Sequence, residues 1–210
     1  GEWEIEKTGL YSEIPDNFSS KIPVPGLVDM ADPIIEEEDS QYDNSLYWYR
    51  KTFEIAKAGL VRLKINMAKY HTKVYLNGQY VGENVYNFTP GIFDLKPYLE
   101  EGENELVISV GSRNNLPDTV INGHDFEKIR YIPGIYDDVK IISSGYPHIN
   151  KVQTVPDIGN SSLRVVAEID KESNYVSERI EYKIREIASG KIVAEGEYLP
   201  TENSFFCQKR

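Results

Sequence analysis

The chain has 210 residues, of which 34 are acidic and 23 are basic, giving a formal net charge of −11. An acidic surface repels phosphate backbones and anionic lipids, so the composition argues against a nucleic-acid partner and against membrane adhesion. Cys207 is the only cysteine, which excludes an internal disulfide and a Cys-X-X-Cys site. No apolar run approaches the roughly 18 residues that a membrane span needs.

The first 45 residues carry little regular patterning. Trp3 and Ile5 predict the start of an edge strand. Because proline removes a backbone donor and fixes φ, the proline-rich stretch that follows predicts an irregular loop. Its prolines are Pro15, Pro23, Pro25 and Pro33. We therefore expect the first strong strand to begin near residue 46.

Residues 46–55 and 60–67 alternate between the two faces of a strand. On one face the second segment carries only apolar side chains, namely Val61, Leu63, Ile65 and Met67. Basic and amide side chains occupy the opposite face. This pattern predicts an antiparallel sheet with one buried and one solvated face.

Residues 73–80 predict a β-hairpin. Val74 and Leu76 alternate with polar side chains, as in a half-buried strand. Asn77 and Gly78 then supply two residues that tolerate positive φ, so the chain can reverse in a tight turn. No long helical pattern interrupts the strands on either side of this hairpin.

Further strands and one long loop follow the hairpin. Short strands are predicted at residues 92–95, 105–110 and 134–142. Residues 111–133 are polar and without periodicity, and a loop of this length is usually functional or mobile. A boundary at Tyr146-Pro147 precedes residues 148–210, which supply four or five strands. Because a complete immunoglobulin-like sandwich needs about seven strands, we expect the second unit to be incomplete.

Six local signatures stand in order along the chain. They are VPG at 24–26, YWYRKTFEI at 47–55, VYLNGQYVG at 74–82, FTPGIFDL at 88–95, GENELVISV at 102–110 and PGIYDDVKI at 133–141. Over residues 20–145 this order resembles the N-terminal sugar-binding domain of glycoside hydrolase family 2, which includes β-galactosidases, β-glucuronidases and β-mannosidases. Residues 148–210 resemble, more weakly, the immunoglobulin-like domain that follows in such enzymes.

The resemblance implies an all-β chain. A jelly-roll, galactose-binding-like β-sandwich is expected at residues 1–146, and a smaller, incomplete immunoglobulin-like β-sandwich at residues 147–210. The family's catalytic pair of glutamates lies on a (β/α)8 barrel, for which this chain has no room. No residue here can be matched to either glutamate, so no catalytic residue is assigned. The chain alone is expected to be inactive, and its parent to be a retaining glycosidase acting on a β-glycoside.

The loop at residues 111–133 is the best candidate for carbohydrate contact. In similar enzymes the segment just before the GIY strand reaches towards the active site of the barrel. Planar polar groups such as those in this loop can form paired hydrogen bonds to sugar hydroxyls. The carbohydrate-proximal candidates are Arg113, Asn114, Asn115, Asp118, His124, Asp125 and Glu127, with Asn122 and Arg130 in the same loop. The alternative is a solvated loop or a packing surface for the barrel.

Aromatic and histidine residues are further candidates for binding roles. A cluster of aromatics could stack on sugar rings, although in a β-sandwich most such residues pack in the core or between domains. These aromatics are Tyr42, Tyr47, Trp48 and Tyr49. The three histidines lack the spacing of metal ligands, so no metal site is predicted, and nothing indicates a cofactor. They are His71, His124 and His148.

Three hypotheses for the function remain open. The favoured one is an accessory module that buttresses the barrel, supplies loops to the active-site rim and contributes to contacts in a homo-oligomer. The second is an independent, lectin-like carbohydrate-binding module, which a groove of exposed aromatics would favour. The third is a structural, adhesion-type sandwich, which would have a short, ordered loop at 111–133. The apolar tail at 204–207 indicates truncation, and the compartment stays open, with a periplasmic or secreted location favoured over a cytoplasmic one.

Overall fold

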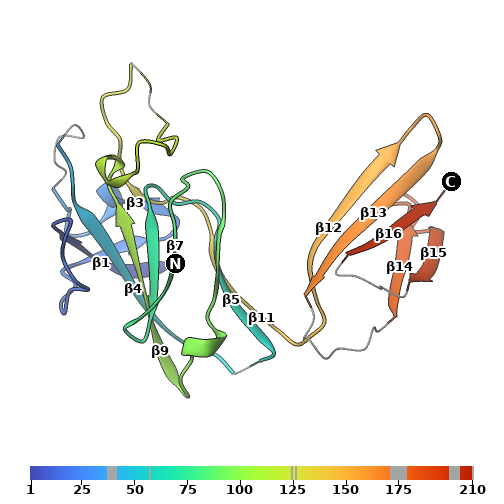
Figure 1. Cartoon of the computed structure of the whole chain (residues 1–210), viewed down its shortest axis with the longest axis horizontal. Coiled ribbons are helices and arrows are strands. Elements are labelled where there is room, and N and C mark those ends of the chain that lie inside the picture. Colours follow the sequence, from blue (N-terminus) through green and yellow to red (C-terminus); the bar gives the residue numbers. More distant parts are fainter. Residues whose placement is uncertain are drawn as a thin grey trace. The chain divides into compact units, whose positions relative to one another are not determined.

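The computed structural model describes residues 1–36, 42–56, 58–123, 125, 127–170, 179–198 and 204–209. Within these residues the regular structure is β-strand, apart from three short 3-10 turns. The prediction of an all-β fold is confirmed. The chain forms two compact units, residues 1–143 and 144–210 (Figure 1).

The first unit contains a six-stranded antiparallel sheet in the order β2-β1-β4-β9-β6-β7 and a three-stranded sheet in the order β11-β5-β8. A short pair, β10-β3, lies outside both sheets. The strands are β1 (Glu2–Thr8), β2 (Ser20–Pro23), β3 (Gly26–Leu27), β4 (Leu46–Glu54), β5 (Leu60–Ile65), β6 (Thr72–Leu76), β7 (Gln79–Asn84), β8 (Gly91–Asp94), β9 (Glu103–Gly111), β10 (Gly134–Ile135) and β11 (Val139–Ser144). The 3-10 turns are η1 (Val28–Met30), η2 (Lys96–Tyr98) and η3 (Arg113–Asn115).

The core of the first unit lies between these two sheets. Apolar side chains at alternate positions of the six-stranded sheet pack against those of the three-stranded sheet, which makes the unit a β-sandwich. Fully buried members include Ile5, Tyr49, Leu76 and Ile108 from the larger sheet and Val61, Leu63 and Ile65 from the smaller one. The alternation predicted for β5 is therefore confirmed.

The predicted hairpin is present as β6 and β7. Asn77 has φ 50° and Gly78 has φ 74°, so both central residues of the two-residue turn are left-handed. This is the type of turn whose twist matches that of the flanking strands. Strand β6 pairs with β7 on one side and with β9 on the other, so the hairpin forms one edge of the six-stranded sheet.

Two expectations for the N-terminal region were wrong. The described part of residues 1–45 forms three strands, and β1 is an interior strand that pairs with β2 and β4 rather than an edge strand. The proline argument failed because β2 ends at Pro23 and is itself the sheet edge, where a missing backbone donor is tolerated. Likewise, the single closing strand expected at 134–142 is two strands in two different sheets, β10 and β11.

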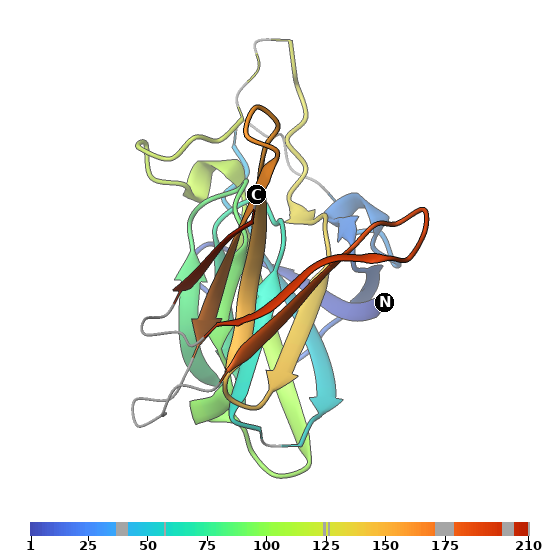
Figure 2. The same cartoon turned by 90° about the vertical axis from the view of Figure 1, so that its right-hand side faces the viewer.

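The second unit contains five described strands: β12 (His148–Asp157), β13 (Ser162–Asp170), β14 (Ile180–Arg185), β15 (Ile192–Tyr198) and β16 (Ser204–Lys209). They form a three-stranded sheet, β12-β13-β16, and a two-stranded sheet, β14-β15. Figure 2 shows these strands from the side, in orange to red. The unit's buried apolar cluster is small and centres on Val165, Ala167 and Ile169 of β13.

Candidate functional site

The long loop at residues 112–133 begins and ends at neighbouring points of the framework. At one end Gly111 and Tyr70 exchange two backbone hydrogen bonds, of 2.6 and 3.1 Å. At the other end Gly134 and Lys69 do the same, at 2.6 and 2.9 Å. The loop is thus closed by two consecutive residues of the β5–β6 connection. In Figures 1 and 2 it projects, in yellow-green, beyond the ends of the strands.

The first turn of this loop is fixed by a capping box. The Ser112 backbone N–H donates to Asn115 Oδ1, and the two residues cap the 3-10 turn η3 reciprocally. The Ser112 hydroxyl and the Asn114 side-chain amide both donate to the carbonyl oxygen of Asp43, the latter at 2.9 Å. Asn115 therefore shapes the loop, and Asp43 anchors it to the segment that leads into β4.

Three of the predicted carbohydrate-proximal residues line one polar hollow. Arg113, Asn114 and Asp118 surround an open space of about 340 Å³. The remaining lining residues are Leu116, Pro117, Val120 and Asn122. A guanidinium, two amides and a carboxylate supply donors and acceptors of the kind that orient sugar hydroxyls.

Two other predicted residues, Asp125 and Glu127, lie in a turn built around Tyr131. The Tyr131 hydroxyl donates to the Asp125 carbonyl at 2.8 Å and accepts from its N–H at 3.1 Å. The Asp125 carboxylate accepts from the Glu127 N–H at 3.0 Å. Neither residue lines the hollow of Arg113 and Asp118. His124 lies outside the described residues.

Cations cover the two tyrosine rings at the base of the loop. The Arg113 guanidinium lies 4.2 Å from the centre of the Tyr131 ring, and Lys128 Nζ lies 5.1 Å from it. Lys69 Nζ lies 5.6 Å from the centre of the Tyr136 ring. These distances are within the range of cation–π attraction.

Burial shifts the pKa values of two side chains at the base of the long loop, Tyr70 and Lys69. Burial raises the pKa of Tyr70 to about 12, against the opposing effect of the Arg113 charge. Burial also lowers the pKa of Lys69, and the positive charge of Lys128 lowers it further. The Tyr70 hydroxyl therefore keeps its proton at neutral pH and can donate a hydrogen bond.

Asn87 ties a second loop to the long one. Its side chain is 1% exposed, and its amide donates to the Ile121 carbonyl at 2.8 Å. Its own carbonyl accepts from the Tyr136 hydroxyl at 2.9 Å. Sequence reasoning missed Asn87, Tyr131 and Tyr136 as parts of this site. The only signal was that Tyr136 lies within the PGIYDD signature and Tyr131 just before it, and this did not show which backbone groups their hydroxyls would contact.

The aromatic side chains of β4 do not form a platform for sugars. Tyr47, Trp48 and Tyr49 are all buried, while Tyr42 is exposed. Trp48 occupies the face opposite to its neighbours, and its Nε1 donates to Thr8 Oγ1 at 2.8 Å. Side chains on both faces of β4 are thus buried at residues 47–49. The prediction that Tyr47, Trp48 and Tyr49 serve in packing is confirmed.

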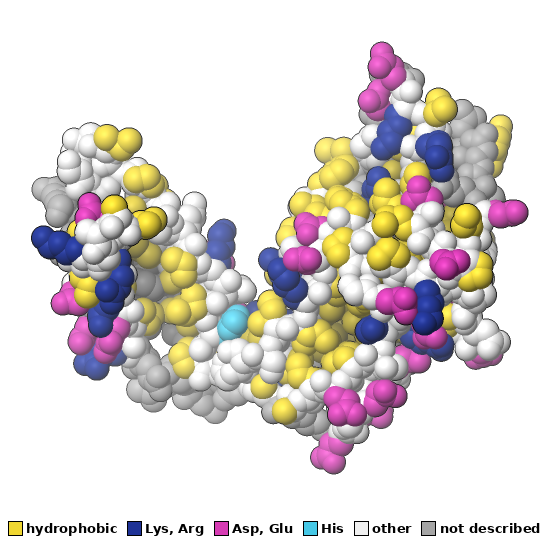
Figure 3. All heavy atoms as spheres, turned by 180° about the vertical axis from the view of Figure 1, so that it is seen from behind, with side chains coloured by type: hydrophobic (Ala, Val, Ile, Leu, Met, Phe, Trp, Pro, Cys, Tyr) yellow, Lys and Arg dark blue, Asp and Glu magenta, His cyan; other side chains and the backbone are white. Residues whose placement is uncertain are grey.

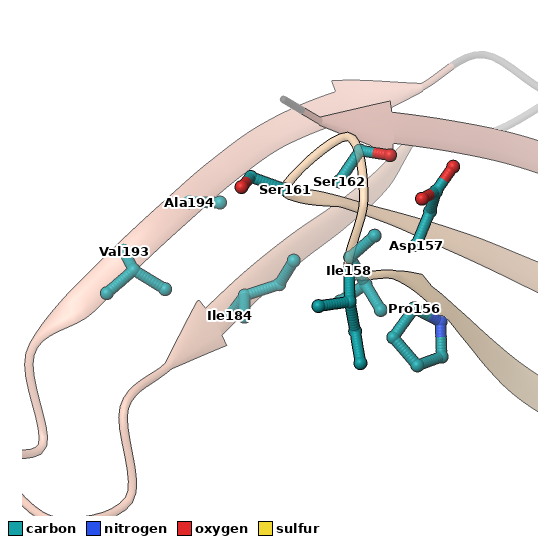
Figure 4. Close-up of a pocket in the computed structure, with 9 residues that line it drawn as sticks. Pro156, Asp157, Ile158, Ser161, Ser162, Ile184, Val193 and Ala194 are labelled. Atoms are coloured by element: carbon teal, nitrogen blue, oxygen red, sulfur yellow. The ribbon is translucent and has the colours of Figure 1, made fainter.

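A second hollow, of about 420 Å³, lies in the second unit between the β12–β13 turn and the β14–β15 hairpin (Figure 4). Aliphatic side chains dominate its lining, among them Ile158, Ile184 and Val193. Saccharide sites need several convergent polar groups, so the polar hollow of the first unit is the better candidate. Across the described part of the chain, no three potential metal ligands gather, and no helix could cross a membrane.

Comparison with known proteins relates the chain to one family of sequences. Residues 8–145 match the family described as glycosyl hydrolases family 2, sugar binding domain. The β-galactosidase of Thermoanaerobacter pseudethanolicus is 32% identical over 165 residues, which are 76% of this chain and 20% of that protein. The β-galactosidase of Halalkalibacterium halodurans is 29% identical over 86% of this chain and 16% of its own length. The chain thus spans at most a fifth of these two relatives.

Solved structures show the same fold. The β-D-mannosidase from Dictyoglomus thermophilum matches with a TM-score of 0.72 over 99% of this chain and 30% of that one, at 20% identity. A β-glucuronidase from Bifidobacterium dentium matches with a TM-score of 0.70 over 100% of this chain and 41% of that one, at 18% identity. Since the family match covers well over half of the residues, the chain belongs to glycosyl hydrolase family 2, and residues 8–145 are its sugar binding domain.

Proposed function

We propose that this chain is the non-catalytic N-terminal part of a family 2 glycoside hydrolase. In this proposal residues 1–146 are a jelly-roll domain of the sugar-binding type, and residues 147–210 belong to an immunoglobulin-like domain. A catalytic barrel elsewhere in the same polypeptide cleaves a β-glycoside. The observation that carries the proposal is the polar hollow of Arg113, Asn114 and Asp118, held on a loop that projects from the sandwich.

Three carboxyl groups of the first and second units are unsuited to act as the general acid of a glycosidase. A glycosidase general acid needs a raised pKa so that it holds a proton at neutral pH. The displaced groups among the described residues are instead lowered, each by a hydrogen-bonding partner. They are Glu4 beside Arg50, Asp138 beside Lys140 and Asp157 beside Asn160. Such carboxylates stay ionised and cannot protonate a leaving group.

The hollow would act by positioning. An open depression of about 340 Å³ buries little of a small sugar, so we expect weak affinity in the isolated chain. Beside a barrel, the same side chains would fix the orientation of a sugar that other residues also hold. Orientation can contribute strongly to rate even where it adds little affinity.

The two alternative hypotheses have less support. A lectin-like module would need a groove of exposed aromatics, whereas Tyr47, Trp48 and Tyr49 are buried. An adhesion-type sandwich would have a short loop between β9 and β10, whereas this loop runs from residue 112 to residue 133. Both observations favour the accessory role.

An activity assay tests the proposal. The 210-residue chain and its longer parent are assayed side by side on nitrophenyl β-galactoside, β-glucuronide, β-mannoside and β-glucoside. We expect the parent alone to cleave one or more of them. Turnover by the 210-residue chain would refute the non-catalytic assignment, and inactivity of the parent on every β-glycoside would refute the hydrolase.

A variant of the parent tests the hollow. Asp118→Ala removes a carboxylate from its lining and should lower kcat/KM by about tenfold, the effect of losing one good hydrogen bond to the substrate. Asp16→Ala, on an exposed loop between β1 and β2, is the matched control and should leave kcat/KM unchanged. Equal effects of the two substitutions would exclude the hollow from substrate contact.

A further inference from the structure

The chain contains two Asn-Gly pairs, Asn77-Gly78 and Asn122-Gly123. Because glycine has no Cβ, its backbone nitrogen can approach the side-chain carbonyl carbon of the preceding asparagine with little steric hindrance. The attack is intramolecular and closes a five-membered ring, so it needs no encounter of two molecules. In a folded chain its rate depends on how far the side chain and the backbone can rearrange.

The first pair is held firmly by its surroundings. Asn77 Nδ2 donates to the Tyr98 carbonyl at 3.0 Å and to Asn104 Oδ1 at 2.9 Å. Asn77 Oδ1 accepts from the Glu105 N–H at 2.9 Å, and the Asn77 N–H donates to the Glu105 carbonyl at 2.9 Å. Several hydrogen bonds must therefore open together before the Asn77 side chain can turn towards the backbone.

The second pair lies in the long loop. The described residues from 116 to 133 form neither strand nor 3-10 turn, so no sheet ladder restrains the backbone there. Gly123 is exposed and has φ +71°. Asn122 is half-buried and has an interaction of its own, so we expect it to differ from Asn77 in degree of restraint. In Figure 3 charged side chains, in dark blue and magenta, cover the end of the first unit that carries this loop, where water has access.

We propose that Asn122-Gly123 is a site of spontaneous deamidation in the folded chain. The Gly123 backbone nitrogen attacks Asn122 Cγ, a nitrogen–carbon bond forms, and the bond from Cγ to the side-chain nitrogen breaks. The proton of the attacking nitrogen leaves with that group as ammonia. Water then opens the succinimide, at the Cγ side to give aspartate or at the main-chain carbonyl to give isoaspartate. Water is the only co-reactant.

Deamidation would change the polar hollow, because Asn122 lines it together with Arg113 and Asp118. An amide both donates and accepts hydrogen bonds, whereas a carboxylate only accepts. The hollow would lose an amide donor and gain a second negative charge beside Asp118. This consequence for the parent enzyme rests on the proposed function, whereas the modification itself does not.

Peptide mapping of the 210-residue chain tests the modification. The folded chain is aged in mildly alkaline buffer and digested with trypsin, and mass spectrometry follows the conversion of amide to acid at each asparagine. We expect Asn122 to react at least about tenfold faster than Asn77, because the hydrogen bonds of Asn77 must open first. Equal rates at the two sites, or an intact Asn122, would overturn the proposal.

The same experiment in urea separates structure from local sequence. Both pairs are Asn-Gly, so they should react at similar rates once the chain is unfolded. A difference that persists in urea would overturn the structural explanation. Asn122→Gln supplies a second control, because its longer side chain must close a larger ring, and it should abolish the fast reaction at residue 122 in the folded chain.

An activity arm on the parent tests the consequence. Asn122→Asp imitates the aspartate product and should lower kcat/KM by about fivefold, the effect of losing one hydrogen-bond donor. Asn17→Asp, on the exposed loop between β1 and β2, adds the same charge elsewhere and should leave kcat/KM unchanged. If Asn122 deamidates but the two variants behave alike, the modification stands and the role of the hollow fails. If Asn122 stays intact and only Asn122→Asp lowers kcat/KM, the modification fails and the hollow stands.

Discussion

At the scale of single residues, Gly134 combines a left-handed backbone with close packing against the backbone of another segment. Its φ is +150°, which L side chains rarely adopt. A Cβ at this position would lie 2.6 Å from the carbonyl oxygen of Gly26 and 2.7 Å from Leu27 Cα. Two of the signatures found in the sequence, VPG and PGIYDD, therefore meet backbone to backbone, and only glycine permits that approach.

Replacing Gly134 tests this contact. Gly134→Ala should lower the free energy of unfolding by about 2–4 kcal/mol, because both the backbone conformation and the space forbid a methyl group. Urea denaturation measures the change. The control is Gly145→Ala, at a position where a Cβ would meet nothing within 4 Å, and it should shift stability by less than about 0.5 kcal/mol. A similar decrease in the free energy of unfolding in both variants would contradict the view that steric crowding at Gly134 causes the loss.

The ion pair of Glu4 and Arg50 makes stability depend on pH. Arg50 Nε donates to Glu4 Oε2 at 2.8 Å and lowers the pKa of that carboxyl below 4.5. A lowered folded-state pKa contributes stability above the unfolded value, and that contribution is lost as the pH falls through the folded value. Nearly half of the Glu4 side chain is exposed, so solvent screening keeps the effect small.

Glu4→Gln should therefore cost about 0.5 kcal/mol at pH 7, with a difference from the wild type that vanishes towards pH 3. Thermal unfolding at both pH values measures it. Glu2→Gln, on the same strand and paired with the more exposed Lys21, should have a smaller effect at both. A difference that grows on acidification would contradict the assigned direction.

The sequence predicted those residue roles that depend on near neighbours. Asn77-Gly78 could be assigned to a left-handed turn because the turn chemistry is local. From the sequence, Asn115 and Asp125 could be recognised only as polar residues of a long loop. Their partners are Ser112 in the capping box and Tyr131 beneath the turn, and the pattern of the loop did not show which polar groups would be used internally. Whether either residue also contacts sugar stays a prediction.

At the scale of elements, Asn104 on β9 joins two turns at one end of the larger sheet. It is fully buried, and its Oδ1 accepts from Asn77 Nδ2 and from the Glu100 N–H, both at 2.9 Å. Its amide donates to the carbonyls of Glu100 and Gly102. Asn77, in turn, accepts from the Glu105 N–H at 2.9 Å. One side chain thus satisfies the backbone groups that the 98–104 turn leaves unpaired.

Asn104→Ala should lower the free energy of unfolding by about 2–4 kcal/mol, because a fully buried side chain that makes four hydrogen bonds is lost and its partly buried partners are left unpaired. Asn17→Ala, on an exposed loop, is the matched control and should be near neutral. Urea denaturation of both variants gives the comparison. An unchanged free energy of unfolding in Asn104→Ala would mean that water replaces the hydrogen bonds of the amide equally well.

Strand positions were predictable where alternation was clean and less so where both faces are covered. The alternation of β5 predicted which side chains are buried. In β4 three consecutive residues, Tyr47 to Tyr49, are buried, because the outer face at Trp48 is also covered. The early strands were missed because their pairing, β2 with β1 and β3 with β10, depends on segments far along the chain or beyond a proline-rich loop.

At the scale of the whole molecule, the two units differ in the size of their buried clusters. The first has a large core between two sheets, whereas the described part of the second has a cluster centred on three residues of β13. Local stability follows the density of buried apolar contacts. We therefore expect the two units to unfold separately, the second at the lower temperature.

Limited proteolysis tests this expectation. Apart from the loop at residues 111–133, residues 1–146 should resist digestion, and early cleavage should fall in that loop and beyond residue 148. Mass spectrometry of a time course with trypsin, which can cut at Lys128 and Lys151, would map the sites. Equal resistance along the whole chain would contradict a weaker second unit, and early cuts within β4 or β9 would contradict a stable first one.

The closure of the long loop by Lys69 and Tyr70 has a consequence for how such domains diverge. Four backbone hydrogen bonds to Lys69 and Tyr70 hold the residues on either side of the loop, so the distance that the loop must span is set by backbone atoms. The entropic penalty of a longer loop grows only slowly with its length. The part of the loop beyond the capped turn can thus change in length while the sheets keep their registers, so we expect it to tolerate insertions better than any strand of the first unit.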